Sequence, residues 1–307
     1  MTFTLIAEQT LNGLQLGIML FLLAAGLTLV FGIMNLVNLA HGSLYMVGAY
    51  LATWGAQATG SWALGVLIGL AGTLVVGMAV ELVALRNLYQ RDHLDQVLAT
   101  FGLILFFNEL IAILWGRSAI YSSLPDYLAG HVQLAGDLRY PLYRLVIIAV
   151  GLAAAAGLWF LVARTRLGML IRAGASNREM IAALGINIRL LYTVVFGFGA
   201  ALAGLAGLLA GPLFAVQPGM GEQILIQVFV VIVIGGIGSI RGALAGALIV
   251  GVVDTLGRAF LKPTLSAVFS PAAGDAAGPA LASMLIYLLM AVVLAFRPAG
   301  LFPARGA

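Results

Sequence analysis

Long apolar stretches separated by short polar breaks run along the whole chain. Nine of these stretches have about the 20 mainly apolar residues with which a helix crosses a bilayer. They cover residues 11–33, 43–60, 62–85, 96–115, 143–163, 191–210, 223–240, 243–261 and 281–297. The second, seventh and eighth are short or broken by glycine, and positions 237–242 barely allow a turn. We therefore expect an all-α polytopic transmembrane bundle of about eight or nine spans, with one or two broken or re-entrant segments.

The composition extends this interpretation to the entire chain. Of 307 residues, 63% are hydrophobic and only 8% are charged, whereas a soluble domain is roughly 25% charged. The polar loops are too short to bury a separate core, so we expect residues 1–307 to form a single transmembrane domain. A signal peptide has basic residues before its apolar run, and the first apolar stretch of this chain has none. This stretch is therefore expected to remain as a span.

The basic residues predict the orientation in the membrane. Ten of the fifteen lie in alternate loops that include residues 86–91, 164–189 and 241. Because basic residues collect in cytoplasmic loops, these loops are expected to be cytoplasmic, and residues 121–140 are expected to lie outside. The N-terminus then faces outward if all nine stretches cross. The net charge of +4 is explained by the basic residues that collect in cytoplasmic loops, so it does not indicate nucleic-acid binding.

A short charged helix is predicted inside the cytoplasmic loop 164–190. Ser176 and Glu179 match the capping box S-x-x-E, and Gly185 stands where a left-handed residue ends a helix. The predicted helix therefore covers residues 177–184. Its apolar side chains follow i, i+3, i+4 spacing and are expected to form one patch: Met180, Ile181 and Leu184. So short a helix is marginal alone, and we expect it to pack on another surface.

A second polar block interrupts the apolar sequence near the end of the first stretch. Its polar members are Asn35, Asn38, His41 and Ser43, and Gly42 would allow the helix to break. Polar groups at membrane depth must face protein, water or substrate, and the N-terminus of a half-helix can hold a carboxylate. The alternative is a polar contact between helices. The other histidines, His93 and His131, are distant, so His41 predicts no metal site.

Four charged residues lie in or near the apolar stretches, where charge is costly and commonly functional. Glu109 could line the pathway and meet a substrate ammonium, or pair with an arginine of a partner subunit. Asp254 and Arg258 stand four residues apart on one helix, which favours a local ion pair near the outer end. Glu81 lies close to Arg86 at the cytoplasmic end and is interpreted as interfacial.

Three blocks in this order resemble one family. They are NLVNLAHGSLYMVGAYLA (35–52), RAGASNREMIAALGIN (172–187) and VIVIGGIGSIRGALAGALIVGVVD (231–254). Together with the length and spacing of the chain, they resemble the permease subunits of bacterial branched-chain amino acid ABC importers, of the LivH type. The middle block resembles the cytoplasmic coupling loop of ABC importer permeases.

The resemblance implies a multi-pass protein of the bacterial inner membrane that hydrolyses no ATP and needs no cofactor. The implied partners are a second homologous permease subunit, two cytoplasmic ABC ATPase subunits and a periplasmic substrate-binding protein. The implied substrates are leucine, isoleucine and valine, although related permeases carry urea or short amides. The residues implied in coupling to the ATPase are Arg172, Ser176, Arg178, Glu179, Met180, Ile181, Leu184 and Gly185. The polar and charged positions described above, rather than the resemblance, indicate the expected pathway residues: Asn35, Asn38, His41, Gly42, Ser43 and Glu109.

Two other classes of protein fit the sequence less well. A stand-alone secondary transporter usually carries ion-coupling charges within its spans, and Glu109 and Asp254 are few for that role. An intramembrane enzyme is weaker, because the chain has no H-E-x-x-H, no G-x-S-x-G and no suitably paired aspartates. It also has no cysteine, which leaves neither thiol catalysis nor a thiolate metal site.

Overall fold

The computed structural model describes the whole chain except residues 1–2, 136–137 and 304–307. Helices dominate it, and a single two-stranded hairpin lies among the described residues. The first half contains α1 (Phe3–Met34), α2 (His41–Thr59), α3 (Trp62–Val83), the 3₁₀ turn η1 (Leu85–Leu88), α4 (His93–Trp115) and the turn η2 (Asp126–Leu128). The hairpin follows, with β1 (His131–Ala135) antiparallel to β2 (Leu138–Pro141). The second half contains α5 (Leu142–Arg164), α6 (Arg166–Ser176), α7 (Arg178–Ala183), α8 (Ile188–Ala210), α9 (Met220–Gly235), α10 (Ile240–Val268) and α11 (Pro271–Phe296).

The predicted all-α polytopic bundle is confirmed. Seven helices of the described chain are long and apolar enough to cross a membrane, namely α1, α3, α4, α5, α8, α10 and α11. The stretch 223–240 is short as predicted, because α9 has only 16 residues. The stretch 43–60 forms the 19-residue helix α2. The expectation that the stretch 243–261 is broken is wrong: α10 is a continuous helix of 29 residues.

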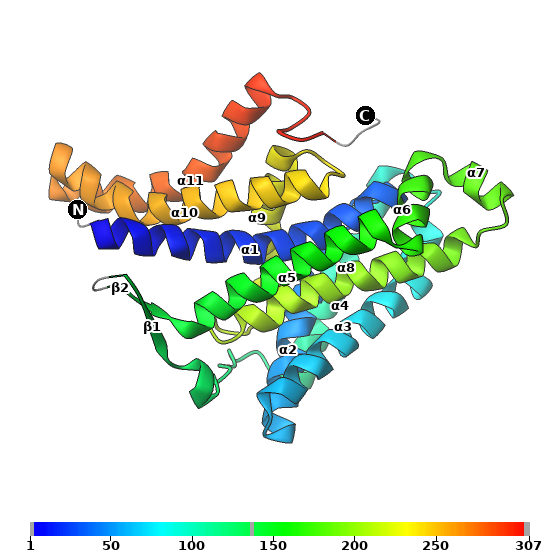
Figure 1. Ribbon diagram of the computed structural model, residues 1–307, viewed down its shortest axis with the longest axis horizontal. Helices are drawn as coiled ribbons and strands as arrows, with labels where there is room; N and C mark the ends of the chain where they lie inside the picture. The colour runs from blue at the N-terminus through cyan, green and yellow to red at the C-terminus, as the bar shows by residue number, and fades with distance from the viewer. Residues whose placement is uncertain (1–2, 136–137, 304–307) are drawn as a thin grey trace.

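Two helices form the centre of the bundle. In the most apolar part of α1 83% of the residues are buried, and in that of α8 72%, whereas the value for α11 is 11%. Figure 1 shows α1 running through the middle of the molecule, with α10 on one side and α5 and α8 on the other. The faces of α3, α4, α5 and α11 that point away from this centre are apolar and exposed, as expected where lipid or another subunit covers them.

Small residues allow the central helices to approach closely. A Cβ atom added to Gly48 of α2 would lie 2.4 Å from the Cα atom of Gly204 in α8. Likewise, a Cβ atom on Gly13 of α1 would lie 2.7 Å from the Cα atom of Val252 in α10. Backbones that approach so closely gain dispersion contacts, which replace the hydrophobic driving force that is absent between helices in lipid.

The two ends of the bundle carry different connections. Figure 1 shows α6 and α7 at one end, and the β1–β2 hairpin with the N-terminal end of α1 at the other. The loop 164–190 and the segment 121–140 therefore lie at opposite ends, as the basic residues predict. The hairpin itself was not predicted. A further bridge pairs Ile120 with Val216 and joins the segment before the hairpin to the loop between α8 and α9.

Candidate functional site

The loop between α5 and α8 contains two helices where one was predicted. Thr165 begins the first, α6, by accepting a hydrogen bond from the backbone N–H of Gly168 at 3.1 Å. Ser176 is the last residue of α6, and Asn177 has an extended backbone between the two helices. The Asn177 side chain accepts from the N–H of Met180 at 2.9 Å. The prediction that Ser176 caps the second helix is therefore wrong, because Asn177, an equally favourable capping residue, occupies that position.

The C-terminal end of α7 has the predicted geometry. Gly185 has a φ of 82°, in the left-handed region that glycine enters without steric cost. The N–H of Ile186 donates to the carbonyl of Ile181 at 3.3 Å, and that of Gly185 to the carbonyl of Ala182 at 3.0 Å. These are the two hydrogen bonds of a Schellman motif, so α7 is capped at both ends.

The three apolar side chains of α7 do not form the single patch that was expected. Ile181 is only 5% exposed, whereas Met180 is 59% and Leu184 72% exposed. Ile181 therefore packs against the protein and leaves Met180 and Leu184, one turn apart, on the outward face. Figure 1 shows α7 projecting beyond the ends of the long helices.

The charged residues of this loop have different surroundings. Arg178 and Glu179 are exposed on α7. Arg172 donates instead to the backbone carbonyl of Val162 near the end of α5. Arg172 thus ties α6 to the preceding span.

The polar block near the end of α1 forms a sharp interruption. Asn35, exposed, is the one non-glycine residue of the described chain with a positive φ, 51°, and it ends α1. Residues 35–40 are non-helical, and α2 begins at His41. The break predicted at Gly42 therefore lies earlier. Gly42 is helical, and a Cβ atom there would lie 2.3 Å from the carbonyl oxygen of Gly221, so it serves the contact between α2 and α9.

Three polar residues of the block are buried together with this contact. Asn38, His41 and Ser43 are each at most 3% exposed. The Asn38 side-chain oxygen accepts from the N–H of Ala40 at 3.1 Å. The side-chain nitrogen of Asn38 has no partner among the described residues, and the His41 ring, which lies near the backbone of Leu23, makes no hydrogen bond of normal geometry. Buried polar groups of this kind are costly unless another molecule satisfies them.

Glu109 lies apart from this block. Its carboxylate pairs with Arg117 at 2.8 Å, and both side chains are exposed, 61% and 76%. Within this chain the Glu109 carboxylate is therefore paired with Arg117. The adjacent Asn108 makes the inward contacts, because it donates to Glu222 and accepts from the N–H of Gly219 at 3.1 Å. Asn108 thereby fixes the start of α9 to α4.

A buried ionic network was missed by sequence reasoning. Glu81, interpreted as interfacial from the sequence, is fully buried within the protein near the end of α3. It accepts from the hydroxyl of Thr193 in α8 at 2.6 Å and from that of Tyr89 at 2.9 Å, and it pairs with Arg86 at 3.3 Å. Burial, and after it the charge of Glu81, raises the pKa of Tyr89, so this hydroxyl stays protonated and donates. The network joins α3 to the first turns of α8, directly after the α6–α7 loop.

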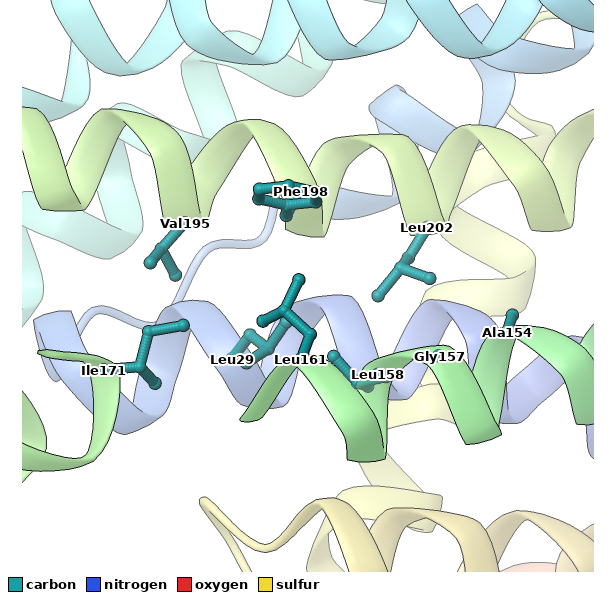
Figure 2. Close-up of a pocket in the computed structure, with 9 residues that line it drawn as sticks. All are labelled: Leu29, Ala154, Gly157, Leu158, Leu161, Ile171, Val195, Phe198 and Leu202. Atoms are coloured by element: carbon teal, nitrogen blue, oxygen red, sulfur yellow. The ribbon is translucent and has the colours of Figure 1, made fainter. Parts of the chain in front are cut away.

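Two cavities differ in the chemistry of their walls. Figure 2 shows the first, of about 180 Å³, with Leu158 and Leu161 of α5 facing Val195, Phe198 and Leu202 of α8 across it. Every lining side chain is apolar, so this cavity offers no partner to an ammonium or a carboxylate. The second, of about 840 Å³, lies between α1, α9 and α10 and is lined by Asp254, Arg258 and several glutamines. No cluster of three metal-ligating side chains occurs in the part of the chain that the structure describes.

The fold agrees with comparisons to known proteins. Residues 9–294 match the family described as "Branched-chain amino acid transport system / permease component". The chain is 30% identical to the high-affinity branched-chain amino acid transport system permease protein BraD of Pseudomonas aeruginosa, over 96% of this chain and 94% of BraD. It is 32% identical to the corresponding permease protein LivH of Escherichia coli K12, over 87% and 91% of the two chains.

A more distant relative has a different named substrate. The chain is 28% identical to the ribose import permease protein RbsC of Escherichia coli K12, over 72% of this chain and 71% of RbsC. No solved structure matches. The family match spans α1 to α11 and includes the α6–α7 loop, the Asn35–Ala40 break and the α9–α10 turn. This chain, a multi-pass membrane protein, therefore belongs to the branched-chain amino acid transport system permease family.

Proposed function

We propose that this chain is a permease subunit of an ABC importer in the bacterial inner membrane and forms the translocation pathway for leucine, isoleucine and valine. The observation that carries the proposal is the family match over residues 9–294, together with about 30% identity to BraD over nearly the full length of both proteins. The seven long apolar helices supply the spans that such a pathway needs.

The proposal includes partners that complete the transporter. They are a second homologous permease subunit, two cytoplasmic ABC ATPase subunits and a periplasmic substrate-binding protein. The exposed apolar faces of α4, α5 and α11 fit contacts with lipid or with the second permease. ATP hydrolysis belongs to the ATPase subunits, and this chain contributes no catalytic group.

The helix α7 is the proposed contact with an ATPase subunit. Its capped ends make it a rigid element, and its outward face presents Met180 and Leu184. Arg178 and Glu179 are exposed beside them and can orient the contact. Ile181 packs inward and Arg172 holds α6 to α5, so a displacement of α7 would reach the spans. In this proposal Ser176 acts at the junction of α6 and α7, and Gly185 acts at the C-terminal end of α7.

We propose that polar groups line the translocation pathway at the interruption between α1 and α2. Asn38, His41 and Ser43 are buried there, and the side-chain nitrogen of Asn38 has no partner among the described residues. Asn35 and Gly42 contribute the backbone geometry of the turn. Glu109, paired with Arg117 on an exposed face, is proposed only as a stabilising residue near the pathway.

Reconstitution tests this function. The chain with its partner permease, both ATPases and the binding protein should take up radiolabelled leucine into proteoliposomes when ATP is supplied, and should not do so when the ATPases are omitted. Unlabelled isoleucine and valine should compete, whereas urea, acetamide and ribose should not. Uptake without ATPases would instead identify a stand-alone secondary transporter, and competition by urea or acetamide alone would identify an amide permease.

A further inference from the structure

The larger of the two cavities described above has the size and position of a binding site. Its volume of about 840 Å³ falls within the range of roughly 300–1,000 Å³ that is typical of small-molecule sites. It lies between the first half of α1, the first turns of α9 and the second half of α10. Next to the turn between them, α9 and α10 touch through Gly235 and Gly242, and the cavity opens farther along both helices.

One wall of this cavity carries a charged pair that is only partly satisfied. Asp254 is 3% exposed, and its Oδ2 accepts from the Nε of Arg258 at 2.9 Å. Its Oδ1 has no partner among the described residues. The terminal nitrogens of Arg258 make no hydrogen bond within the described chain either, and the Arg258 side chain is 54% exposed. A buried carboxylate oxygen without a donor is costly, and it attracts a cationic donor strongly where the dielectric constant is low.

The opposite wall is polar but uncharged. Gln223 and Gln227 lie one turn apart on α9, and both line the same cavity as the Asp254–Arg258 pair. Apolar side chains complete the lining, among them Leu16, Met19 and Ile224. The cavity therefore combines an acceptor for a cation, donors for an anion and a surface for a hydrocarbon group.

We propose that the cavity binds an α-amino acid as a zwitterion during transport. The ammonium group donates to Oδ1 of Asp254, the carboxylate accepts from the terminal nitrogens of Arg258, and the aliphatic side chain packs on Leu16, Met19 and Ile224. The choice of an amino acid as the ligand rests on the proposed function. The location of the site does not depend on that function. An ion pair that only links two turns of α10 would not leave a buried carboxylate oxygen without a donor in a residue that lines a cavity.

A labelling experiment tests this assignment without relying on transport. Because the chain has no cysteine, Gln223→Cys introduces a single thiol into the cavity of the assembled complex. Leucine should slow the reaction of this thiol with a maleimide. 4-Methylpentanoic acid, which lacks the ammonium, and 3-methylbutylamine, which lacks the carboxylate, should not. Adding Asp254→Asn or Arg258→Gln should raise the leucine concentration needed for protection about ten- to hundredfold, the loss expected for a hydrogen bond to a charged group.

Two controls match these variants. Ser122→Cys places a thiol in a separate cavity of about 300 Å³, and leucine should leave its labelling unchanged. Asp275→Asn removes the exposed ion pair with Lys262, 2.7 Å long, at the end of α10, and should not change protection of the Gln223→Cys thiol.

The outcomes separate this site from the proposed function. If leucine does not slow the labelling although the wild-type complex imports leucine, the site is wrong and the function stands. If the wild-type complex imports no leucine, the function fails, whereas protection by leucine still supports the site. Equal protection by the acid or the amine alone would overturn recognition of the zwitterion. Arg258 is exposed enough for its variant to fold even if Asp254→Asn does not.

Discussion

Glu81 and Asp254 are the two carboxylates that lie buried within the described part of the bundle, and each pairs with an arginine that follows it in the chain. Their spacings of five and four residues made the pairing predictable. Their burial was not predictable, because the helices that pack on them, α8 on α3 and α1 on α10, come from distant parts of the sequence. For the same reason, the sequence marked both Asn35 and His41 as unusual polar residues, but it did not predict that His41 is buried and Asn35 exposed.

At this scale we expect Glu81→Gln to destabilise the protein. The substitution leaves Arg86 beside a neutral amide, and breaking a buried ion pair costs about 3–5 kcal/mol. Because the Arg86 side chain is 30% exposed, we expect about 3 kcal/mol, measured as a lower thermal unfolding temperature in detergent.

Glu109→Gln is the matched control for this measurement, because it breaks an ion pair between two exposed side chains and should cost less than about 1 kcal/mol. Equal stability of the two variants would show that the Glu81 network does not hold α3 to α8.

At the scale of elements, hydropathy predicted where the helices are better than where they end. The apolar runs predicted all of the long spans, since lipid requires every backbone group to be satisfied within a helix. The glycines of α10 suggested a break in this helix, which is in fact continuous. Gly242 and Gly251 instead pack against the backbones of α9 and α1. The prediction placed the start of α7 one residue early, because Ser176 and Asn177 are both good capping residues. The hairpin was missed because its strands are only five and four residues long.

The ends of α7 can be tested separately. Gly185→Val forces a β-branched residue into the left-handed region, which costs about 1–2 kcal/mol or more. No atom lies within 4 Å of a Cβ atom added there, so the strain is in the backbone. Leucine uptake should fall sharply while ATP hydrolysis continues uncoupled, and Asn177→Ala, which removes a cap worth about 1 kcal/mol, should have a milder effect.

Gly185→Asn is the control, because asparagine tolerates the left-handed region. It should transport nearly as well as the wild type. Normal uptake by Gly185→Val would show that the geometry at the end of α7 does not matter for coupling.

At the scale of the whole molecule, the asymmetry of basic residues predicts which end faces the cytoplasm. Single cysteines at Ser176 and Ser123 test this orientation; the first position is exposed and, unlike Asn177, does not cap α7. In intact cells an impermeant maleimide should label Ser123→Cys and not Ser176→Cys, and permeabilised cells should show labelling at both. The reverse pattern in intact cells would invert the topology and remove α7 from the reach of a cytoplasmic ATPase.

The central position of α1 has a consequence for biosynthesis. Helix α1 is the most buried of the spans, yet it precedes in synthesis the helices that cover it, α8 and α10. After it leaves the translocon, α1 must therefore stay in lipid until more than two hundred further residues have been made. During this time its close-packing surface around Gly13 and Gly17 is uncovered. Association of preformed helices allows such a delay. A nascent chain that stops before α10 would therefore keep this surface open to lipid.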